Sequence, residues 1–476
     1  MSWREYMTVP ILIDINFAKR LPRELFCDLR FTELLSENAI SVLSHPCDKN
    51  EIRRRQEIFA FFEDDGGNLL SDCINGIKRH KKLYYLLCES KTELERLSLR
   101  TAGLRQYAVL RGCLFRLSSC TALKEFDTFK NGENEQKTAE EAEKILSDMG
   151  GAIISFREKC RLFERKDGEE ENERIKRCAS ALGIPIGERQ VSSLKLPPSV
   201  ASGVLELFPE AVQRLYGILE AYPADHGKEL WSYLPQLEFL REMIAMKRKA
   251  QGKGLPCCFA KISERRKYEA EDIYDIAVLL IKEELPVGNP AHFFEAERVF
   301  FLTGTNGGGK TTYLRTLASN LVFFLGGCAV FGKSASIYPF DTVITHFPAD
   351  ERFENTGRLD DEKQRAEKML AEAEGKNAFL FLNEVYSGTN EENGCELLKA
   401  LALSISEQGH FCLCVTHFYR VSELSFPVLS PAGGYRIERT DEKAFSHAQR
   451  ILKKYGLDKS SLDLRRKNNA IKSAEP

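Results

Sequence analysis

The sequence lacks an excess of charge of either sign. Its 68 Lys and Arg residues nearly balance 70 Asp and Glu residues, so the formal net charge is −2 in a chain of 476 residues. This balance excludes a strongly basic protein that binds nucleic acid through its overall charge, and also an acidic disordered chain. Any anionic partner must therefore be bound by a local patch.

Long apolar runs are also missing. The first apolar stretch is interrupted by Asp14, Asn16 and Lys19, which leaves neither the core of a signal peptide nor a membrane span. We therefore expect a cytoplasmic protein that has no contact with a membrane. The 14 cysteines lie in apolar stretches without partner Cys or His residues at zinc-site spacing, which predicts buried reduced thiols rather than a disulfide scaffold or a zinc centre.

Internal repeats and low-complexity segments are absent too. The content of 43% apolar and 29% charged residues is typical of a folded chain. At about 150 residues per domain, the length allows two to four domains. The sequence therefore predicts a multidomain globular protein.

Helical periodicity dominates residues 1 to about 285. A representative apolar face has members three and four positions apart, namely Leu104, Tyr107, Leu110, Leu114 and Leu117. Further along, Thr138 and Glu141 have the spacing of a capping box and predict the start of a helix. The run from Arg161 to Arg177 mixes basic and acidic residues, and we interpret it as a solvated helix face or a hairpin tip in preference to a DNA-contacting arm.

The pattern changes at about residue 286 to alternating strands and helices. Apolar runs of strand length occupy 299–303, 378–382 and 411–415, and helical patterns lie between them. Such runs are typical of strands buried on both faces in a parallel sheet with crossover helices. We therefore expect an α/β domain over 286–458, followed by a polar C-terminal tail over 459–476.

A phosphate-binding loop follows the first of these strands. The segment reads Gly-Thr-Asn-Gly-Gly-Gly-Lys-Thr, which matches the pattern of Gly, four residues and Gly-Lys-Thr. Glycines allow backbone N–H groups to converge on phosphate oxygens, Lys310 supplies an ammonium group, and the Thr311 hydroxyl can bind Mg²⁺. A chance glycine-rich turn is the alternative, but a strand before the loop and a helix after it favour nucleotide binding. The predicted nucleotide-binding residues of this loop are Gly304, Asn306, Gly307, Gly308, Gly309, Lys310, Thr311 and Thr312.

Two further strands end in residues that suit phosphate chemistry. Glu384 follows the strand 378–382 and is predicted to be the general base that activates water. Asn383 stands where an Asp would normally support Mg²⁺, so the oxygen is kept but its charge is lost, which predicts weak metal binding and slow hydrolysis. His417 ends the third strand and could sense the γ-phosphate, although a histidine at a strand end is more often structural.

Together these segments resemble the MutS family of DNA mismatch-repair ATPases, which belong to the ABC-type ATPases. The resemblance covers the loop from Leu302 to Tyr313, the stretch from Tyr338 to Thr345, and Asn383-Glu384 with the later Ser387-Gly388-Thr389 and Gly394. It continues through Thr416-His417-Phe418 to Phe445-Ser446-His447-Ala448 and Tyr455-Gly456-Leu457. More loosely, Glu51 to Gln56 and Leu234 to Leu255 are similar to the family's core and lever helices.

The resemblance implies a helical core and lever domain over 1–285, with a reduced clamp possible at about 120–185, and an ABC-type P-loop ATPase over 286–458. It implies that Val287 and Asn289 bind the adenine of ATP, that Thr311 and Asn383 hold Mg²⁺, and that Glu384 and His417 are catalytic. It also implies a homodimer formed through the ATPase domains and DNA as a partner. Regions similar to the family's mismatch-recognition and connector domains are not found in the sequence.

One segment departs from the family pattern. The family's signature loop carries a Ser that reaches the partner's γ-phosphate, whereas this sequence has Leu359, followed by Asp360 and Asp361. A leucine cannot donate a hydrogen bond, and two carboxylates would repel a nucleotide. The usual activation across a dimer is therefore not expected.

Two functions of different classes follow from these observations. The first is a MutS-like, Mg²⁺-dependent ATPase that binds ATP and ADP, hydrolyses ATP slowly and binds mismatched or structured DNA in mismatch repair or recombination. The second is a nucleotide-gated switch or scaffold for another protein that does not bind DNA, which Asn383 and Leu359 favour. Transport is a weak third option, because the sequence has neither an LSGGQ-type loop nor a membrane span.

Overall fold

The computed structural model describes residues 10 to 440, except 11, 16, 18, 65–67, 131–132, 163–204, 207 and 348–357, and it describes side chains outside 150–162 and 358–361. Several predicted features lie outside the described residues. These are most of the charged run 161–177, the part of the clamp region from 163 to 185, the signature loop with the side chain of Leu359, the segments 445–448 and 455–457, and the tail 459–476. Contacts divide the chain into a helical unit, Met1–Leu12 with Ala60–Arg241, and an α/β unit, Ile13–Phe59 with Glu242–Pro476.

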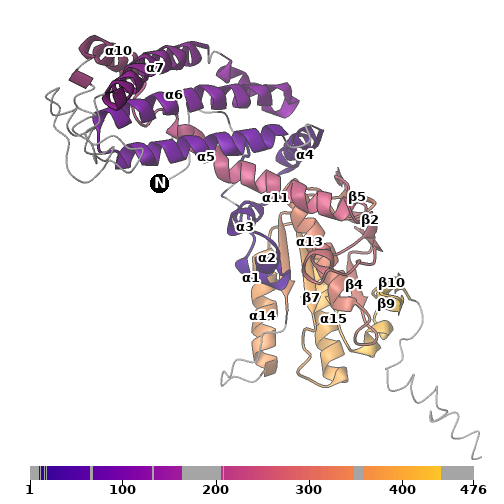
Figure 1. Ribbon diagram of the computed structural model, residues 1–476. Helices are drawn as coiled ribbons and strands as arrows, with labels where there is room; N and C mark the ends of the chain where they lie inside the picture. The colour runs from indigo at the N-terminus through magenta and orange to yellow at the C-terminus, as the bar shows by residue number, and fades with distance from the viewer. Residues whose placement is uncertain are drawn as a thin grey trace, which may run out of the picture. The chain divides into compact units, whose positions relative to one another are not determined.

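The helical unit consists of long helices that lie side by side (Figure 1). Its elements are α5 (Asn68–Glu89), α6 (Glu93–Arg116), η2 (Leu117–Ser119), η3 (Thr121–Phe129), α7 (Glu133–Leu162), α10 (Pro209–Glu220) and η4 (Lys228–Ser232). Two more helices, α4 (Lys49–Asp64) and α11 (Tyr233–Gln251), contribute residues to both units. The predicted apolar face on α6 is confirmed, because Leu104, Tyr107, Leu110 and Leu114 are all buried.

The predicted start of α7 at the capping box is wrong. The helix begins at Glu133, and Thr138 lies inside it, where its hydroxyl donates a hydrogen bond to the carbonyl oxygen of Asn134 at 2.7 Å. Glu133 and Glu135 occupy the first turn, where negative charge interacts favourably with the helix dipole. Acidic residues in the first turn therefore begin this helix five residues before the capping-box pattern does.

The α/β unit contains two sheets. Its helices are α1 (Arg23–Asp28), α2 (Phe31–Leu34), α3 (Glu37–Leu43), α12 (Ile276–Ile281), α13 (Lys310–Leu325), α14 (Arg358–Ala373), α15 (Glu391–Glu407) and η5 (Tyr419–Glu423). The smaller sheet has the order β1-β5-β2-β3, built from β1 (Lys261–Ile262), β5 (Ser334–Ile337), β2 (Lys267–Ile273) and β3 (Asn289–Phe294). The larger sheet has the order β10-β9-β4-β8-β7-β6, built from β10 (Arg436–Arg439), β9 (Val428–Gly433), β4 (Val299–Leu302), β8 (Phe411–Val415), β7 (Ala378–Asn383) and β6 (Thr342–His346).

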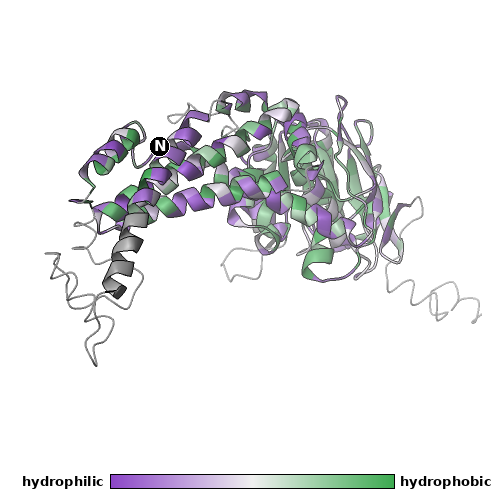
Figure 2. Ribbon diagram, turned by 45° about the horizontal axis from the view of Figure 1, so that its top comes forward, coloured by the Kyte–Doolittle hydropathy of each residue, from purple (hydrophilic) through white to green (hydrophobic). Residues whose placement is uncertain are grey.

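The larger sheet is parallel except for its β9–β10 hairpin. The three predicted strands are confirmed as β4, β7 and β8, and every residue in each of them is buried. Figure 2 shows mainly hydrophobic strands here, whereas the helices of the helical unit carry hydrophilic and hydrophobic residues along their lengths. Because the strands run in the same direction, the segments that follow β4, β7 and β8 meet at one edge of the sheet.

Residues 13–59 belong to the α/β unit, although their sequence predicts only helices. Arg55 on α4 is fully buried, and its guanidinium donates to the carbonyl oxygens of Gly326 (3.0 Å) and Asp14 (2.5 Å) and to Glu51 Oε1 (2.9 Å). Gly326 follows the last turn of α13, so this side chain joins α4 to the helix that begins at the phosphate-binding loop. The strands β1 and β2 also lie before residue 286, in the part of the sequence where helical patterns dominate. The domain limits 1–285 and 286–458 stay a prediction.

No helix in the described part of the chain is long and apolar enough to cross a bilayer. The cysteines of the described residues are free thiols, most of them buried or partly buried. Cys27 and Cys88 are exposed, which differs from the expected burial, because the positions they take on α1 and α5 face solvent.

Candidate nucleotide site

The loop between β4 and α13 has the backbone of an anion-binding turn. Gly304, Gly307 and Gly309 have φ angles of 140°, 76° and 87°, a region that glycine adopts without strain. Gly309 precedes α13 without a side-chain cap, and the amide of Tyr313 makes the first hydrogen bond back to its carbonyl. The amides of residues 310 to 312 therefore lie ahead of the first intrahelical bond, where N–H groups and the helix dipole favour an anion.

Lys310 is the first residue of α13 and is 6% exposed. Its ammonium donates to the carbonyl oxygens of Gly304 (2.7 Å) and Thr305 (3.1 Å) and to Asn306 Oδ1 (3.4 Å). Burial lowers the pKa of Lys310, and the nearby charge of Glu384 acts in the opposite direction. The loop thus holds a desolvated cation beside its own amide groups, which is the arrangement that phosphate oxygens need.

The second residue of α13 faces the end of β7. The Thr311 hydroxyl donates to Asn383 Oδ1 at 3.3 Å, and Asn383 is buried. Two oxygen atoms from different elements therefore lie together, as a Mg²⁺ ion requires of its protein ligands. The pair fits a magnesium ion in geometry, but Asn383 supplies a neutral oxygen where a carboxylate would supply charge.

Glu384 and His417 are in direct contact. The distance between Glu384 Oε2 and His417 Nδ1 is 2.7 Å, and the amide of Glu384 donates to Val415 O at the end of β8. Glu384 has a φ of 58°, a left-handed conformation that is uncommon outside glycine. Such strain at a strand end is held by the surrounding structure and is frequent at functional sites.

One of the two predicted adenine-binding residues is bonded to the β9–β10 hairpin. Asn289 is buried at the start of β3, and its side-chain amide donates to Tyr435 O (3.1 Å) and Val287 O (3.4 Å), while Oδ1 accepts from the amide of Ile437 (2.8 Å). These bonds occupy the amide with the β9–β10 hairpin. Adenine binding by Val287 and Asn289 therefore stays a prediction, and any contact from Asn289 must compete with this structural role.

The β9–β10 hairpin contributes residues that sequence reasoning missed. A Cβ atom added to Gly304 or Gly308 would lie 2.7 Å from Pro431, and one added to Gly309 would lie 3.3 Å from Tyr435. Tyr435 is 62% exposed although it is aromatic. An exposed tyrosine after Gly433-Gly434 was the available signal, but only the sheet order shows that this turn lies on the phosphate-binding loop.

A buried histidine also lies at the same edge of the sheet. His346 ends β6 and pairs in register with Leu382 of β7. Neither of its ring nitrogens has a hydrogen bond to the residues that the structure describes, and burial together with the charge of Arg365 lowers its pKa to about 4. The ring is therefore neutral at pH 7 and was not singled out by any sequence pattern.

The structure thus brings most of the predicted site residues together. The glycine loop, Lys310 and Thr311 meet Asn383, Glu384 and His417 at the carboxyl ends of β4, β7 and β8. Thr312 lies in the first turn of α13 and is half-buried, and Gly394 on α15 contacts the ring of Phe418. No bond from the Thr312 side chain distinguishes it among the described contacts, so its place in the nucleotide site stays a prediction.

Comparisons with known proteins find a family match over the part of the chain that contains this loop. Residues 300–460 match the family model of MutS domain V. A DNA mismatch repair protein MutS from Bacillus licheniformis is 27% identical over 205 residues, which are 40% of this chain and 23% of that protein. The corresponding protein from Bacillus pumilus is 25% identical over the same shares. The chain spans less than a quarter of the length of these curated relatives.

Proposed function

Because the C-terminal part of this chain is MutS-like, we propose that the protein binds ATP at its glycine loop and hydrolyses it slowly. We propose further that the nucleotide controls binding to mismatched or structured DNA. The observation that carries the first step is the assembly of Lys310, Asn383 and the Glu384–His417 pair at one sheet edge, beside the amides of the first turn of α13. Cytoplasmic location and a homodimer with ATP between the two subunits belong to the same proposal.

Phosphate binding follows from the loop itself. The ammonium of Lys310 exchanges its bonds to the loop carbonyl groups for the β- and γ-phosphate oxygens of ATP. The amides at the start of α13 donate to the same oxygens. The base would pack against the exposed ring of Tyr435, which lies beside Gly309, and against the Val287 segment.

Hydrolysis requires that water attack the γ-phosphorus while the bond to ADP breaks. Glu384 accepts the proton of that water, ADP leaves with the electron pair of the broken bond, and His417 holds the Glu384 carboxylate in position. Thr311 and Asn383 would hold Mg²⁺, which neutralises phosphate charge when it is bound. Because Asn383 is neutral, the ion is bound weakly and turnover is slow.

Binding of a fluorescent ATP analogue tests the first half of the proposal. Lys310→Ala should weaken binding by about 100-fold or more, because the buried ammonium is lost from the loop. Lys399→Ala, at an exposed position on α15, is the matched control and should leave binding unchanged. Equal affinity of the two variants would sink the nucleotide site.

The DNA half of the proposal rests on the family resemblance. An electrophoretic shift with mismatched, branched and fully paired duplexes, each with and without ATP, tests it. We expect binding that weakens steeply with salt and changes with nucleotide. No shift of any substrate at low salt would reject DNA as the partner.

Asn383 gives a specific reason to keep a second function in view. A site without a charged carboxylate ligand for Mg²⁺ favours holding a nucleotide over hydrolysing it. A switch that binds another protein would need this property. In that case the ATP-bound chain should capture a stable protein partner in nuclease-treated extract, and Lys310→Ala should lose it. Capture that depends on added nucleic acid would instead support the first function.

A further inference from the structure

The helical unit carries a concentrated group of lysines and aromatic residues on α5. Lys78, Lys81, Lys82 and Tyr85 have the spacing of a single helix face. Lys78 and Lys82 are exposed, and Tyr85 is 52% exposed. In a chain with a net charge of −2, this face is a local basic patch of the kind that an anionic partner needs.

Residues from η4 complete an aromatic–basic cluster, which we define as Lys81, Tyr84, Tyr85, Lys228 and Trp231. The ring of Trp231 lies 5.4 Å from that of Tyr84 and 6.3 Å from that of Tyr85. Lys228 Nζ lies 3.9 Å from the centre of the Tyr84 ring, and Lys81 Nζ lies 5.7 Å from the centre of the Trp231 ring. Cations and ring faces are therefore interleaved on one surface.

A hydrogen bond to a buried histidine fixes the indole ring of Trp231 in this cluster. The indole Nε1 of Trp231 donates to His80 Nδ1 at 2.9 Å, and His80 is 5% exposed. Burial and the neighbouring His226 lower the pKa of His80 to about 4, so its ring stays neutral and accepts this bond at pH 7. Because the ring is already fixed, little side-chain entropy is lost when a ligand stacks on this surface.

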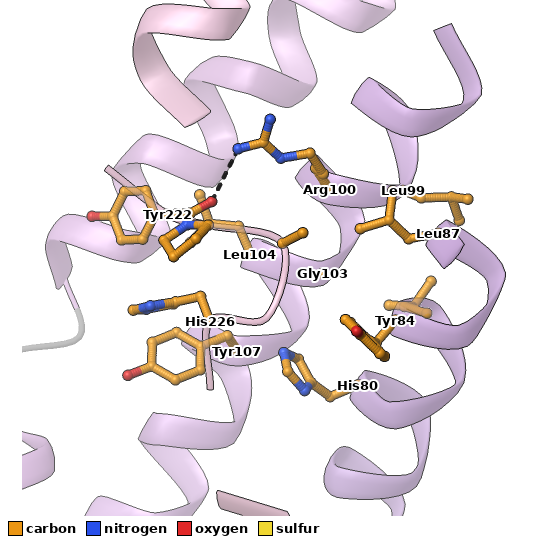
Figure 3. A pocket seen from close by; sticks show the side chains of 13 residues that line it. His80, Tyr84, Leu87, Leu99, Arg100, Gly103, Leu104, Tyr107, Tyr222 and His226 are labelled. Carbon is orange, nitrogen blue, oxygen red and sulfur yellow. Dashed lines mark hydrogen bonds between the residues drawn. The ribbon is translucent and has the colours of Figure 1, made fainter. Parts of the chain in front are cut away.

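A cavity behind the cluster is too small for an aromatic ligand. His80 and Tyr84 line it from α5, Arg100 and Tyr107 from α6, and His226 from the loop before η4 (Figure 3). Its volume of about 30 Å³ suits about two water molecules, which would bond Arg100 Nε and His226 Nε2, two buried atoms that have no partner among the described residues. A stacked ring would therefore have to lie on the exposed side, against Tyr85.

The charges around the cluster favour a polyanion. Lys78 is paired with Glu238 at 2.7 Å, and Asp225 lies close enough to act on Lys228. Lys81 and Lys82 have no carboxylate partner within the part of the chain that the structure describes. A ligand that has both regularly spaced negative charges and flat apolar rings can bind the lysines of this surface and stack on its aromatic side chains.

We propose that the aromatic–basic cluster, together with the adjacent Lys82, binds single-stranded nucleic acid, with a base stacked on Tyr85 beside Trp231 and phosphates bound by Lys81, Lys82 and Lys228. Unpaired bases are required because a duplex hides the faces of its bases, whereas a single strand offers them to aromatic side chains. The site is separate from the ATP site and adds a location and a strand preference to the DNA-binding half of the proposed function, on which it rests.

Fluorescence anisotropy with a labelled oligo(dT) of about 12 nucleotides, the length scale of such sites, tests the proposal on the full chain at low salt. The double variant Lys81→Glu with Lys82→Glu should bind at least about tenfold more weakly. Tyr85→Ala should lose about five- to tenfold, and Tyr85→Phe should retain binding, because stacking needs the ring but not the hydroxyl.

The matched control reverses the charge at two exposed lysine positions on another helix. Lys137→Glu with Lys144→Glu changes the charge of α7, which packs on α6, by the same amount. An equal loss in this control would overturn the proposal in favour of general charge attraction. Equal affinity for a fully paired duplex of the same length would overturn the stacking argument, and equal affinity for polyglutamate would point to an acidic protein partner.

Trp231 supplies a direct readout. In a Trp3→Phe background it is the sole tryptophan, so oligo(dT) should quench its emission on stacking, and an unchanged emission at saturation would count against the proposal. The Lys310→Ala variant separates this site from the ATP site. It should lose ATP binding but keep quenching, whereas the α5 variants should bind ATP normally even if the DNA-binding half of the proposed function fails with duplexes.

Discussion

The two units use lysine and histidine in opposite ways. In the α/β unit Lys310 is buried and bonded to the carbonyl groups of its loop, whereas Lys81 and Lys228 in the helical unit lie over aromatic rings at the surface. His417 contacts a carboxylate at a strand end, whereas His80 is buried and accepts a bond from an indole. The chemistry of a residue type is therefore set by the element that presents it, and the comparison predicts where substitutions will act on catalysis and where on binding or stability.

The largest effect is expected at the carboxylate beside His417. Glu384→Gln should lower ATP turnover by about 1000-fold with little change in ATP affinity, because an amide cannot accept the proton of the attacking water. His417→Gln should lower turnover by about tenfold, because it removes only the group that positions the carboxylate. Steady-state phosphate release measures both effects.

Glu407→Gln, at an exposed position near the end of α15, is the matched control for the carboxylate. If Glu384→Gln and Glu407→Gln hydrolyse ATP equally well, Glu384 is not the general base. In that event His417 would have no general base to position, and its contact with Glu384 would not be catalytic.

The second effect concerns pH and applies to a histidine in each unit. The pKa values of His80 and His346 are lowered to about 4, so the unfolded chain binds protons near pH 6.5 while the folded chain does not. Stability is therefore lost as the pH falls from about 6.5 toward 4. Each site should contribute about 2 kcal/mol between pH 7 and pH 5.

Urea unfolding at the two pH values measures this loss. His80→Gln keeps an acceptor for Trp231 but does not titrate, so it should reduce the pH dependence, and His292→Gln on the exposed part of β3 should not. Identical pH dependence in wild type and His80→Gln would show that His80 is not held neutral by burial.

The third effect compares two helical glycines. A Cβ added to Gly394 would lie 2.3 Å from the ring of Phe418, whereas one added to Gly103 on α6 meets nothing within 4 Å. Gly394→Ala should therefore destabilise the α/β unit by about 2 kcal/mol through overpacking. Gly103→Ala should stabilise the helical unit by about 0.5 kcal/mol, because alanine favours a helix interior.

Thermal unfolding followed by circular dichroism checks the pair. The decisive result is that the two substitutions shift the melting temperature in opposite directions, and the sizes of the shifts are secondary. If both substitutions lower the melting temperature, Gly103 has a role on α6 that its open surroundings do not show.

The smallest effect is expected at the metal position. Asn383→Asp adds a carboxylate beside Thr311, so the Mg²⁺ concentration needed for half-maximal hydrolysis should fall by about five- to tenfold. A titration with MgCl₂ at saturating ATP measures it. A rise in the Mg²⁺ requirement would mean that Asn383 does not face the metal.

Sequence patterns predicted the backbone elements of the candidate nucleotide site because those patterns are local. The spacing from Gly304 to Lys310 needs only a strand, a turn and a helix, and these three are continuous in the chain. Asn383, Glu384 and His417 could be predicted as neighbours because parallel strands end at the same edge of a sheet. The adenine residues were taken from the family resemblance and stay a prediction, and the structure shows the side-chain amide of Asn289 bonded to the β9–β10 hairpin.

Other features depend on residues far apart in the chain and left no readable signal. The position of Tyr435 beside Gly309 follows from the pairing of β9 with β4. The membership of residues 13–59 in the α/β unit rests on their contacts with distant parts of the chain, among them the bond of Arg55 to Gly326. The start of α7 at Glu133 was missed because two helix-start patterns occur within nine residues and only one can be used.

By itself, the sequence determined the phosphate-binding loop, the buried strands and the types of residue that end them, because each depends on the local backbone and on hydrophobic period. Only the tertiary structure decided which of these side chains touch, as Glu384 and His417 do across β7 and β8. It also brought Trp231 of η4 onto the lysines and tyrosines of α5, about 150 positions earlier in the chain. Contacts between distant segments depend on packing and on strand order, which no short stretch of sequence contains.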